Sequence, residues 1–196
     1  MPILTGIFGR LRRCFNDFEV SGENCMINND SPAIIEQYKR SLAEYTIDQL
    51  RYKSEEDVWS IGQMYIHVID VAEEYIGHIH TCTIAAQEEH GDKTEDGTKA
   101  FLEKAWPDVR VKLEEPVNRT RNPDSKDEII AGLEQVLKKL KYWEEHVRGA
   151  NPACKVRHGW FGWLNAREWF EMIGMHSRHH LRQKARLDQK LAEAGL

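Results

Sequence analysis

Apolar residues recur every three or four positions in four long segments of the chain, which is the period of an amphipathic helix. The first segment begins at Ser31 and Pro32, a capping residue followed by a proline suited to a first turn. Its apolar stripe is Ile35, Tyr38, Leu42 and Tyr45. The second segment runs from about Asp57 to about Ala86 and is apolar over much of its circumference, which predicts burial on several sides.

Two further helices are expected in the second half of the chain. The third follows Ser125, which with Glu128 has the spacing of a capping box. Its stripe is Ile129, Leu133, Val136, Leu140, Trp143 and Val147. The fourth begins at Asn165, with Glu168 three residues on, and continues to about Ala192.

The connections between these helices predict the topology. Only the residues RYKSEED separate the first helix from the second, so these two should be antiparallel neighbours. The polar stretch from Gln87 to Asp124 is long enough to cross the molecule, because a 28-residue helix is ~42 Å long and ~13 extended residues cover that distance. Within it, FLEKAWPDVRVKLEEP should pack outside, with a short extended piece at Val109 to Leu113. We predict an all-α fold: a four-helix bundle with a long crossover between the second and third helices.

Composition narrows the functional classes. A chain of 196 residues suits one domain. Its formal charge of −5 argues against a nucleic-acid surface over the whole protein. No apolar run approaches the ~20 residues that cross a bilayer. The four cysteines show no CxxC spacing, which favours reduced thiols in a cytoplasmic protein.

The N-terminal stretch MPILTGIFGRLRRCF lacks acidic residues and places its apolar residues on one helical face. Three interpretations remain open. The stretch is a targeting or membrane-surface helix, an amphipathic arm packed on the domain, or an over-extended start with initiation at Met26.

Two histidines continue the core stripe of the fourth helix, which is Trp169, Ile173, His176, His180, Leu187 and Leu191. His176 and His180 lie one turn apart on one face, so both imidazoles can reach one ion. A third ligand is expected from His67, on the helix that looks most buried. His179 lies ~60° around the helix from His176 and is expected beside the site. The alternative is that the histidine pair is incidental.

Three segments together, WSIGQMYIHVID, HGWFGWLNAREWFEMIGMHSRHHLRQ and IIEQYKRSLAEY, resemble the DinB-like (DinB/YfiT) superfamily of bacterial metal-binding four-helix proteins. The resemblance covers about residues 30–191 and is strongest in the second and fourth helices. The family pattern implies that His67, His176 and His180 are the metal ligands. Because residues 1–25 lie outside the resemblance, we expect an N-terminal extension over 1–25 and a DinB-like domain over 26–196.

Three imidazoles leave a divalent ion with an open position, the arrangement of catalytic zinc. Zinc is the first expectation, with nickel, iron or manganese as alternatives, because imidazole discriminates poorly among them. The resemblance implies a metal-dependent thiol transferase that uses a low-molecular-weight thiol against electrophilic small molecules, with metal-dependent hydrolysis as a variant. The competing interpretation is a non-catalytic metal- or ligand-binding stress protein, because no acid–base residue is evident beside the ligands.

Residues expected around the mouth of the site are Trp59, Gln63, Asp70, Trp169, Arg178 and His179. Asp70 either orients an imidazole or is a solvated helix residue. Gln63 either meets the substrate or caps a helix, and the two tryptophans either wall the site or belong to the core. The resemblance also implies a small-molecule substrate and a homodimer. The acidic charge disfavours DNA binding, and no membrane partner is expected.

Overall fold

The computed structural model describes residues 30–107 and 120–196. The elements are α1 (Ser31–Leu42), α2 (Ile47–Arg51), α3 (Ile61–Ile84), α4 (Glu95–Glu103), α5 (Lys126–His146), the 3₁₀ turn η1 (Val147–Gly149), β1 (Lys155–His158), β2 (Gly162–Asn165) and α6 (Ala166–Glu193). The chain is therefore mostly helical, as an all-α class requires, with one small antiparallel sheet. The three interpretations of residues 1–25, the Met26 start and the extended piece at 109–113 lie outside the described residues.

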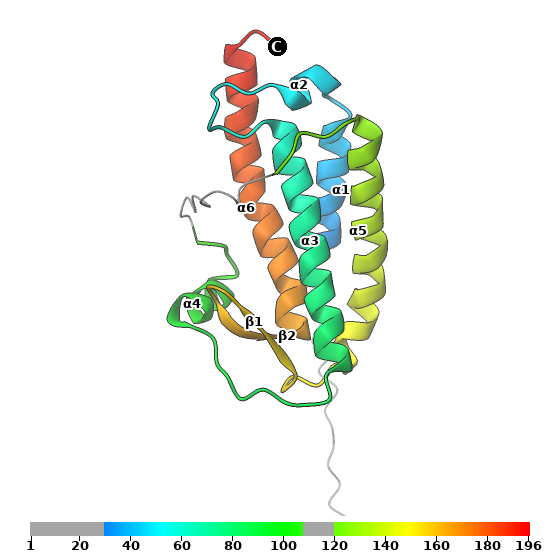
Figure 1. Cartoon of the computed structure of the whole chain (residues 1–196), viewed down its shortest axis with the longest axis vertical. Helices are drawn as coiled ribbons and strands as arrows, with labels where there is room; N and C mark the ends of the chain where they lie inside the picture. The colour runs from blue at the N-terminus through cyan, green and yellow to red at the C-terminus, as the bar shows by residue number, and fades with distance from the viewer. Residues whose placement is uncertain (1–29, 108–119) are drawn as a thin grey trace, which may run out of the picture.

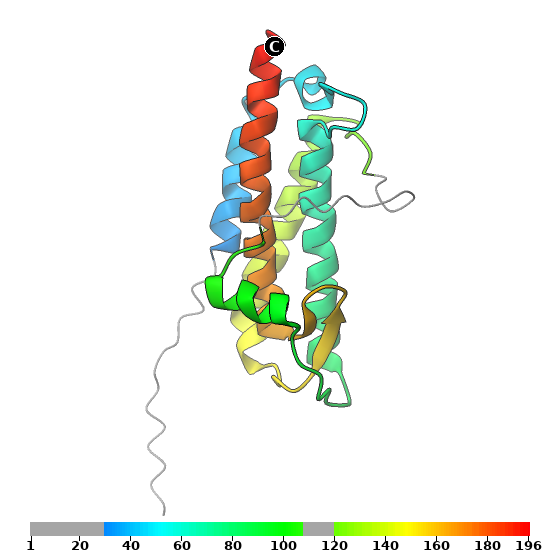
Figure 2. The same cartoon turned by 90° about the vertical axis from the view of Figure 1, so that its left-hand side faces the viewer.

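The four longest helices, α1, α3, α5 and α6, lie side by side (Figures 1 and 2). Helices α1 and α3 each pack against both α5 and α6. Figure 1 shows that α5 begins at the end of the molecule where α3 begins, whereas α1 and α6 run in the opposite direction. Helices α3 and α5 therefore run in the same direction.

The core of the molecule follows the predicted stripes. All six stripe positions of α5 and the following turn are buried, as are the four of the first segment. Buried residues occur around most of the circumference of α3, as its breadth of apolar positions predicts. Two free cysteines, Cys82 and Cys154, are buried within the described part of the chain.

Side-chain caps determine where the long helices begin. Asn165 accepts hydrogen bonds from the amides of Arg167 and Glu168, and Glu168 accepts one from the Asn165 amide, so the predicted start of α6 is confirmed. Ser125 caps α5 by accepting from the Glu128 amide, but the Glu128 carboxylate accepts from Asp124 rather than closing a capping box. Helix ends predicted by periodicity alone are less accurate, since α3 begins at Ile61 rather than near Asp57.

Three short elements were not predicted. The first predicted helix is two helices, because α1 ends at Leu42 and Thr46 starts α2 with a capping box to Gln49. Helix α4 lies in the connection between α3 and α5. The hairpin formed by β1 and β2 precedes α6 and pairs antiparallel, with Val156 opposite Leu164.

Helix α4 docks against the hairpin through two glycines. A Cβ on Gly97 would lie 2.3 Å from the Phe161 carbonyl oxygen, so only glycine allows this approach of the two backbones. Gly162 has φ +80° and forms an isolated bridge with Lys93. The Thr94 hydroxyl, which caps α4, donates to the Trp160 carbonyl. Together these contacts place the residues that follow α4 beside α6.

Among the described residues, no helix combines the length and the apolar character needed to cross a bilayer.

Candidate metal centre

Three histidines from two helices meet inside the molecule. The Nε2 atom of His176 lies 3.3 Å from that of His67 and 3.0 Å from that of His180. One ring nitrogen from each residue lies within 4.8 Å of the other two. His176 and His180 are buried and His67 is partly exposed. The three histidines selected by helical phase therefore converge, and His67 is the most exposed of them.

The start of α3 sets the position of His67. Ser60 caps the helix by accepting from the Gln63 amide, and Gln63 accepts from the Ser60 amide in return. The Ser60 hydroxyl also contacts the Asn122 side-chain oxygen at 2.5 Å, and the Gln63 amide group donates to the Thr120 carbonyl. His67 follows this cap by two turns, on a helix that packs closely against α6.

A pair of tyrosines connects three helices at the level of the histidines. The buried Tyr65 hydroxyl of α3 donates to the Tyr38 carbonyl of α1 at 3.0 Å. The Tyr38 hydroxyl donates to the Ser177 carbonyl of α6 at 2.8 Å. Tyr65 lies two residues before His67 and Ser177 directly follows His176, so these bonds fix the spacing of the helices that carry the histidines.

Aromatic rings surround the three imidazoles. The Trp59 ring lies 4.8 Å from His67 and 6.5 Å from His180, and the Trp106 ring lies 5.0 Å from His176. Both tryptophans are partly exposed. They reach the site from different connections, before α3 and after α4, and form apolar walls beside it.

Burial keeps the imidazoles neutral. It lowers the pKa of His67 to about 4, with a smaller contribution from His179, and the pKa of His180 to about 3, with a contribution from His67. The pKa of His176 is lowered well below its usual value by burial and then by His180. Among the described residues, no carboxylate contributes to these shifts. At neutral pH the cluster is therefore uncharged and each ring has a lone pair.

The cluster cannot satisfy its own ring nitrogens. His176 Nε2 lies between two other Nε2 atoms, but a neutral imidazole nitrogen either donates one proton or accepts one. At least one of the two contacts therefore lacks a good hydrogen bond. A divalent cation accepts all three lone pairs at once, so the donor set fits a metal ion.

Two residues beside the histidines were not predicted from the sequence. The His180 Nδ1 atom lies 2.6 Å from the Gln183 side-chain oxygen, one turn further along α6. A glutamine three residues after a histidine on the same helix face is a signal that the sequence contains. Trp106 was also missed, because it follows a helix that periodicity did not reveal.

Gln63 and Asp70 contact groups other than the three histidines. Gln63 uses both ends of its amide in the cap of α3 and in the bond to Thr120, which is the capping alternative. Asp70 lines a cleft of about 400 Å³ between α3 and α5, together with Arg121 and Glu128. Burial raises the Asp70 pKa, and Arg121 opposes that shift.

Of the other three residues predicted around the site, one belongs to the hydrophobic core and two lie on α6 close to the histidines. Trp169 is buried and packs against Tyr75 and His78, so it belongs to the core. Arg178 pairs with Asp30 and donates to the Lys104 carbonyl, which connects α6 to the start of α1 and the end of α4. His179 lies beside the site, with its ring 5.1 Å from that of His180.

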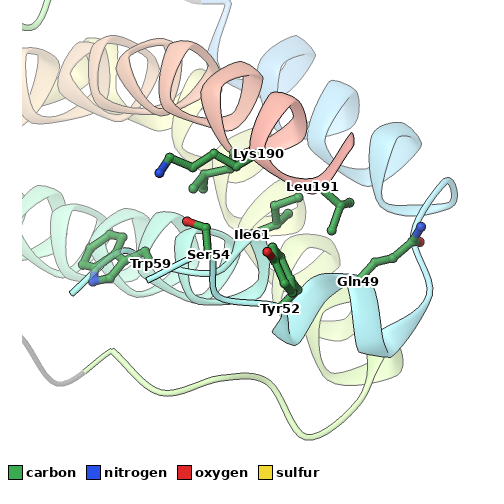
Figure 3. Close-up of a pocket in the computed structure, with 8 residues that line it drawn as sticks. Gln49, Tyr52, Ser54, Trp59, Ile61, Lys190 and Leu191 are labelled. Carbon is green, nitrogen blue, oxygen red and sulfur yellow. The ribbon is translucent and has the colours of Figure 1, made fainter. Parts of the chain in front are cut away.

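Trp59 also lines a small pocket between the end of α6 and the α2–α3 connection (Figure 3). The pocket has about 10 Å³ open to water, which is space for about one water molecule. Its other lining residues include Ser54, Ile61 and Lys190. Trp59 therefore contacts both this small pocket and the histidines.

The fold and the three histidines define a helical protein with a candidate metal centre. The family model described as the DinB superfamily matches residues 35–183, which is well over half of the chain. The chain belongs to the DinB superfamily. The match contains all three histidines and ends at Gln183. No curated protein and no solved structure matches the chain.

Proposed function

We propose that His67, His176 and His180 hold a divalent metal ion and that the protein is a metal-dependent thiol transferase acting on electrophilic small molecules. The observation that supports this proposal is the convergence of three neutral imidazole nitrogens on one point. The cluster combines ligands from α3 and α6, so only the folded chain offers the complete donor set.

The charge of the donor set favours an anionic guest. Three imidazoles contribute no negative charge, and among the described residues no carboxylate shifts their pKa values. When bound, a divalent ion would supply a Lewis acid that retains its +2 charge and depresses the pKa of a thiol or water in its open position. A thiol is the guest of our proposal.

The walls of the site favour apolar substrates. Trp59 and Trp106 offer ring faces and edges next to the imidazoles, and such surfaces exclude water from the reacting atoms. In the overall reaction the thiol sulfur forms a bond to the electrophilic carbon. The leaving group departs with its electron pair, and the thiol proton passes to solvent.

Zinc is the proposed ion, with nickel, iron or manganese as alternatives, because the ligand set consists of imidazoles alone. We further propose that the four long helices form a four-helix bundle with a crossover between α3 and α5. Their side-by-side packing and the shared starting end of α3 and α5 support this architecture. A cytoplasmic homodimer that binds neither DNA nor a membrane completes the proposal.

A non-catalytic metal- or ligand-binding protein is the second candidate. It is favoured by the engagement of two carboxylates of α3 and α6, the helices that carry the histidines, in ion pairs. Glu73 pairs with Lys139, and Glu168 pairs with Lys93. A hydrolase would need one such group as a base, so this observation also weighs against the hydrolase variant.

Turnover of a thiol-reactive electrophile tests the proposal. Protein purified without a histidine tag and loaded with zinc is assayed with monobromobimane and, in turn, bacillithiol, mycothiol, glutathione and cysteine. We expect at least one thiol to give a rate above background that a chelator abolishes. His176→Ala should lose this rate, whereas His90→Ala, which changes an exposed loop histidine, should retain it. If every thiol gives only the background rate, the binding protein becomes the better description.

A further inference from the structure

Gln183 contacts the ring nitrogen of His180 that faces away from the histidine cluster. Its side-chain oxygen lies 2.6 Å from His180 Nδ1, while His180 Nε2 lies 3.0 Å from His176 Nε2. We infer that Gln183 is a positioning residue, which holds His180 in the Nδ1–H tautomer and directs the Nε2 lone pair at the ion. The metal ion in this inference rests on the proposed function. The tautomer of His180 rests on the hydrogen bond alone.

The chemistry of the two groups determines the tautomer. An amide oxygen only accepts hydrogen bonds, so the proton of this contact must be on His180 Nδ1. An imidazole that ligates a metal ion is neutral. A neutral imidazole carries one proton, which leaves Nε2 unprotonated and able to donate its lone pair to a cation.

His180 differs in this respect from the other two histidines. Within the described residues, it is the histidine of the cluster whose second ring nitrogen hydrogen-bonds to a side chain. The i, i+3 spacing places Gln183 and His180 on one face of α6, so the helix itself brings the two side chains within hydrogen-bonding reach. His180 is therefore oriented before an ion binds. Metal binding then loses less conformational entropy, because this side chain is already fixed.

The choice of glutamine also preserves the charge of the site. A carboxylate at this position would accept the same proton but would add a negative charge near the ion. The neutral amide orients the ring and leaves the charge of the ion to act on its guest. Gln183 thus combines orientation of His180 with the electrophilic character that the proposed transferase requires.

The opposite orientation of the Gln183 amide is the competing arrangement. The NH₂ group would then donate to Nδ1, and the His180 proton would move to Nε2, where it blocks metal binding. Gln183→Glu discriminates between the two, because an ionised carboxylate can accept from Nδ1–H but cannot donate. Gln183→Leu removes both possibilities.

The test measures the tautomer and the zinc affinity of four proteins: the unaltered chain, Gln183→Leu, Gln183→Glu and Gln189→Leu. Gln189 lies on the same helix and hydrogen-bonds to Glu193, so it controls for loss of a glutamine from α6. Long-range ¹⁵N–¹H spectra of the chelator-treated proteins report the His180 tautomer. Competition with a chromophoric chelator reports zinc affinity.

We expect His180 in the Nδ1–H form in the unaltered chain, Gln183→Glu and Gln189→Leu. Zinc should bind 10–100-fold more weakly to Gln183→Leu, a range typical for ligand-orienting partners, and about equally to the other three. An Nε2–H tautomer in the unaltered chain overturns the inference, as does equal zinc affinity of the two leucine variants. If no protein binds zinc, the proposed function fails, and the tautomer in the unaltered chain and Gln183→Leu still decides whether Gln183 orients His180.

Discussion

The Nε2 atoms of His67 and His176 lie 3.3 Å apart, although 109 positions separate these residues in the chain. One belongs to α3 and the other to α6, helices that run in opposite directions. No local segment can therefore build the cluster, and an ion bound there would connect the two helices directly. Metal binding and the stability of the folded chain should consequently be coupled.

Removal of the ion should destabilise the protein. An ion that binds only the folded state adds about 2.7 kcal/mol to the free energy of unfolding when its free concentration is 100 times Kd. We expect chelator treatment to lower the midpoint of chemical unfolding, and added zinc to restore it. The same titration on His176→Ala should leave the midpoint unchanged, and a zinc response equal to that of the unaltered protein would contradict this expectation.

The tyrosine connection between the helices should contribute to stability and to metal affinity. Tyr38→Phe removes the buried hydrogen bond to the Ser177 carbonyl and should cost about 1 kcal/mol in the free energy of unfolding. Zinc affinity should also fall, because α6 loses a contact next to His176. Tyr142→Phe is the matched control, since Tyr142 is 54% exposed, and it should change neither quantity. The account of the connection is wrong if the two variants behave alike.

His158 should make stability fall at acidic pH. Its Nδ1 accepts hydrogen bonds from the backbone amides of Trp160 and Phe161, and burial lowers its pKa to about 4. In the unfolded chain the pKa is about 6.5. Between pH 4 and pH ~6.5 the His158 imidazole is protonated in the unfolded chain but not in the folded chain. The contribution of neutral His158 to stability is therefore present above pH ~6.5 and is lost as the pH falls toward 4.

Substitution of His158 isolates this effect from that of the metal ligands. His158→Asn keeps an acceptor for the two amides but does not titrate. In chelator-treated protein the drop in unfolding free energy from pH 7 to pH 5 should be smaller in His158→Asn by about 1–2 kcal/mol. One group that titrates fully over the ~1.5 pH units below pH 6.5 contributes ~2 kcal/mol, and partial solvent exposure of His158 reduces this value. Equal drops in both proteins would show that the hairpin does not depend on a neutral His158.

The docking of α4 on the hairpin should depend on Gly97. In Gly97→Ala the new methyl group would lie 2.3 Å from the Phe161 carbonyl oxygen, which is backbone and cannot rotate away. We expect a loss of about 2 kcal/mol in the free energy of unfolding, as for other overpacked positions. Gly77→Ala, in the open middle of α3, should instead stabilise by about 0.5–1 kcal/mol. If both substitutions changed the free energy of unfolding in the same direction, the close approach of α4 to the hairpin would be contradicted.

The long helices could be predicted from the sequence because their apolar period extends over many turns. The break between α1 and α2 could not, since Tyr45 stays buried after the helix ends and continues the stripe. Helix α4 was hidden by Gly97, which is a helix breaker by propensity and is required here by the Phe161 backbone. The strands β1 and β2 have four residues each, too few to show a period of two.

The three histidines could be predicted because a histidine at an apolar stripe position departs from the pattern of the residues around it. The residues around them were harder to assign, since a polar side chain on a helix has several partners within reach. Gln63 illustrates this, because the sequence permits a helix cap or a contact with substrate, and only the reciprocal hydrogen bonds with Ser60 identify the cap. Gln183 was missed because its role depends on a rotamer directed at His180, which periodicity does not encode.

The claim that three histidines hold one metal ion is tested most directly by the metal content of the protein with and without one of these side chains. Elemental analysis is applied to the protein purified without a histidine tag, to His176→Ala and to His90→Ala. The account predicts about one divalent ion per chain, as a single three-histidine site requires, in the unaltered protein and His90→Ala, and a marked loss in His176→Ala. Equal metal in all three proteins would contradict the account and remove the site from consideration.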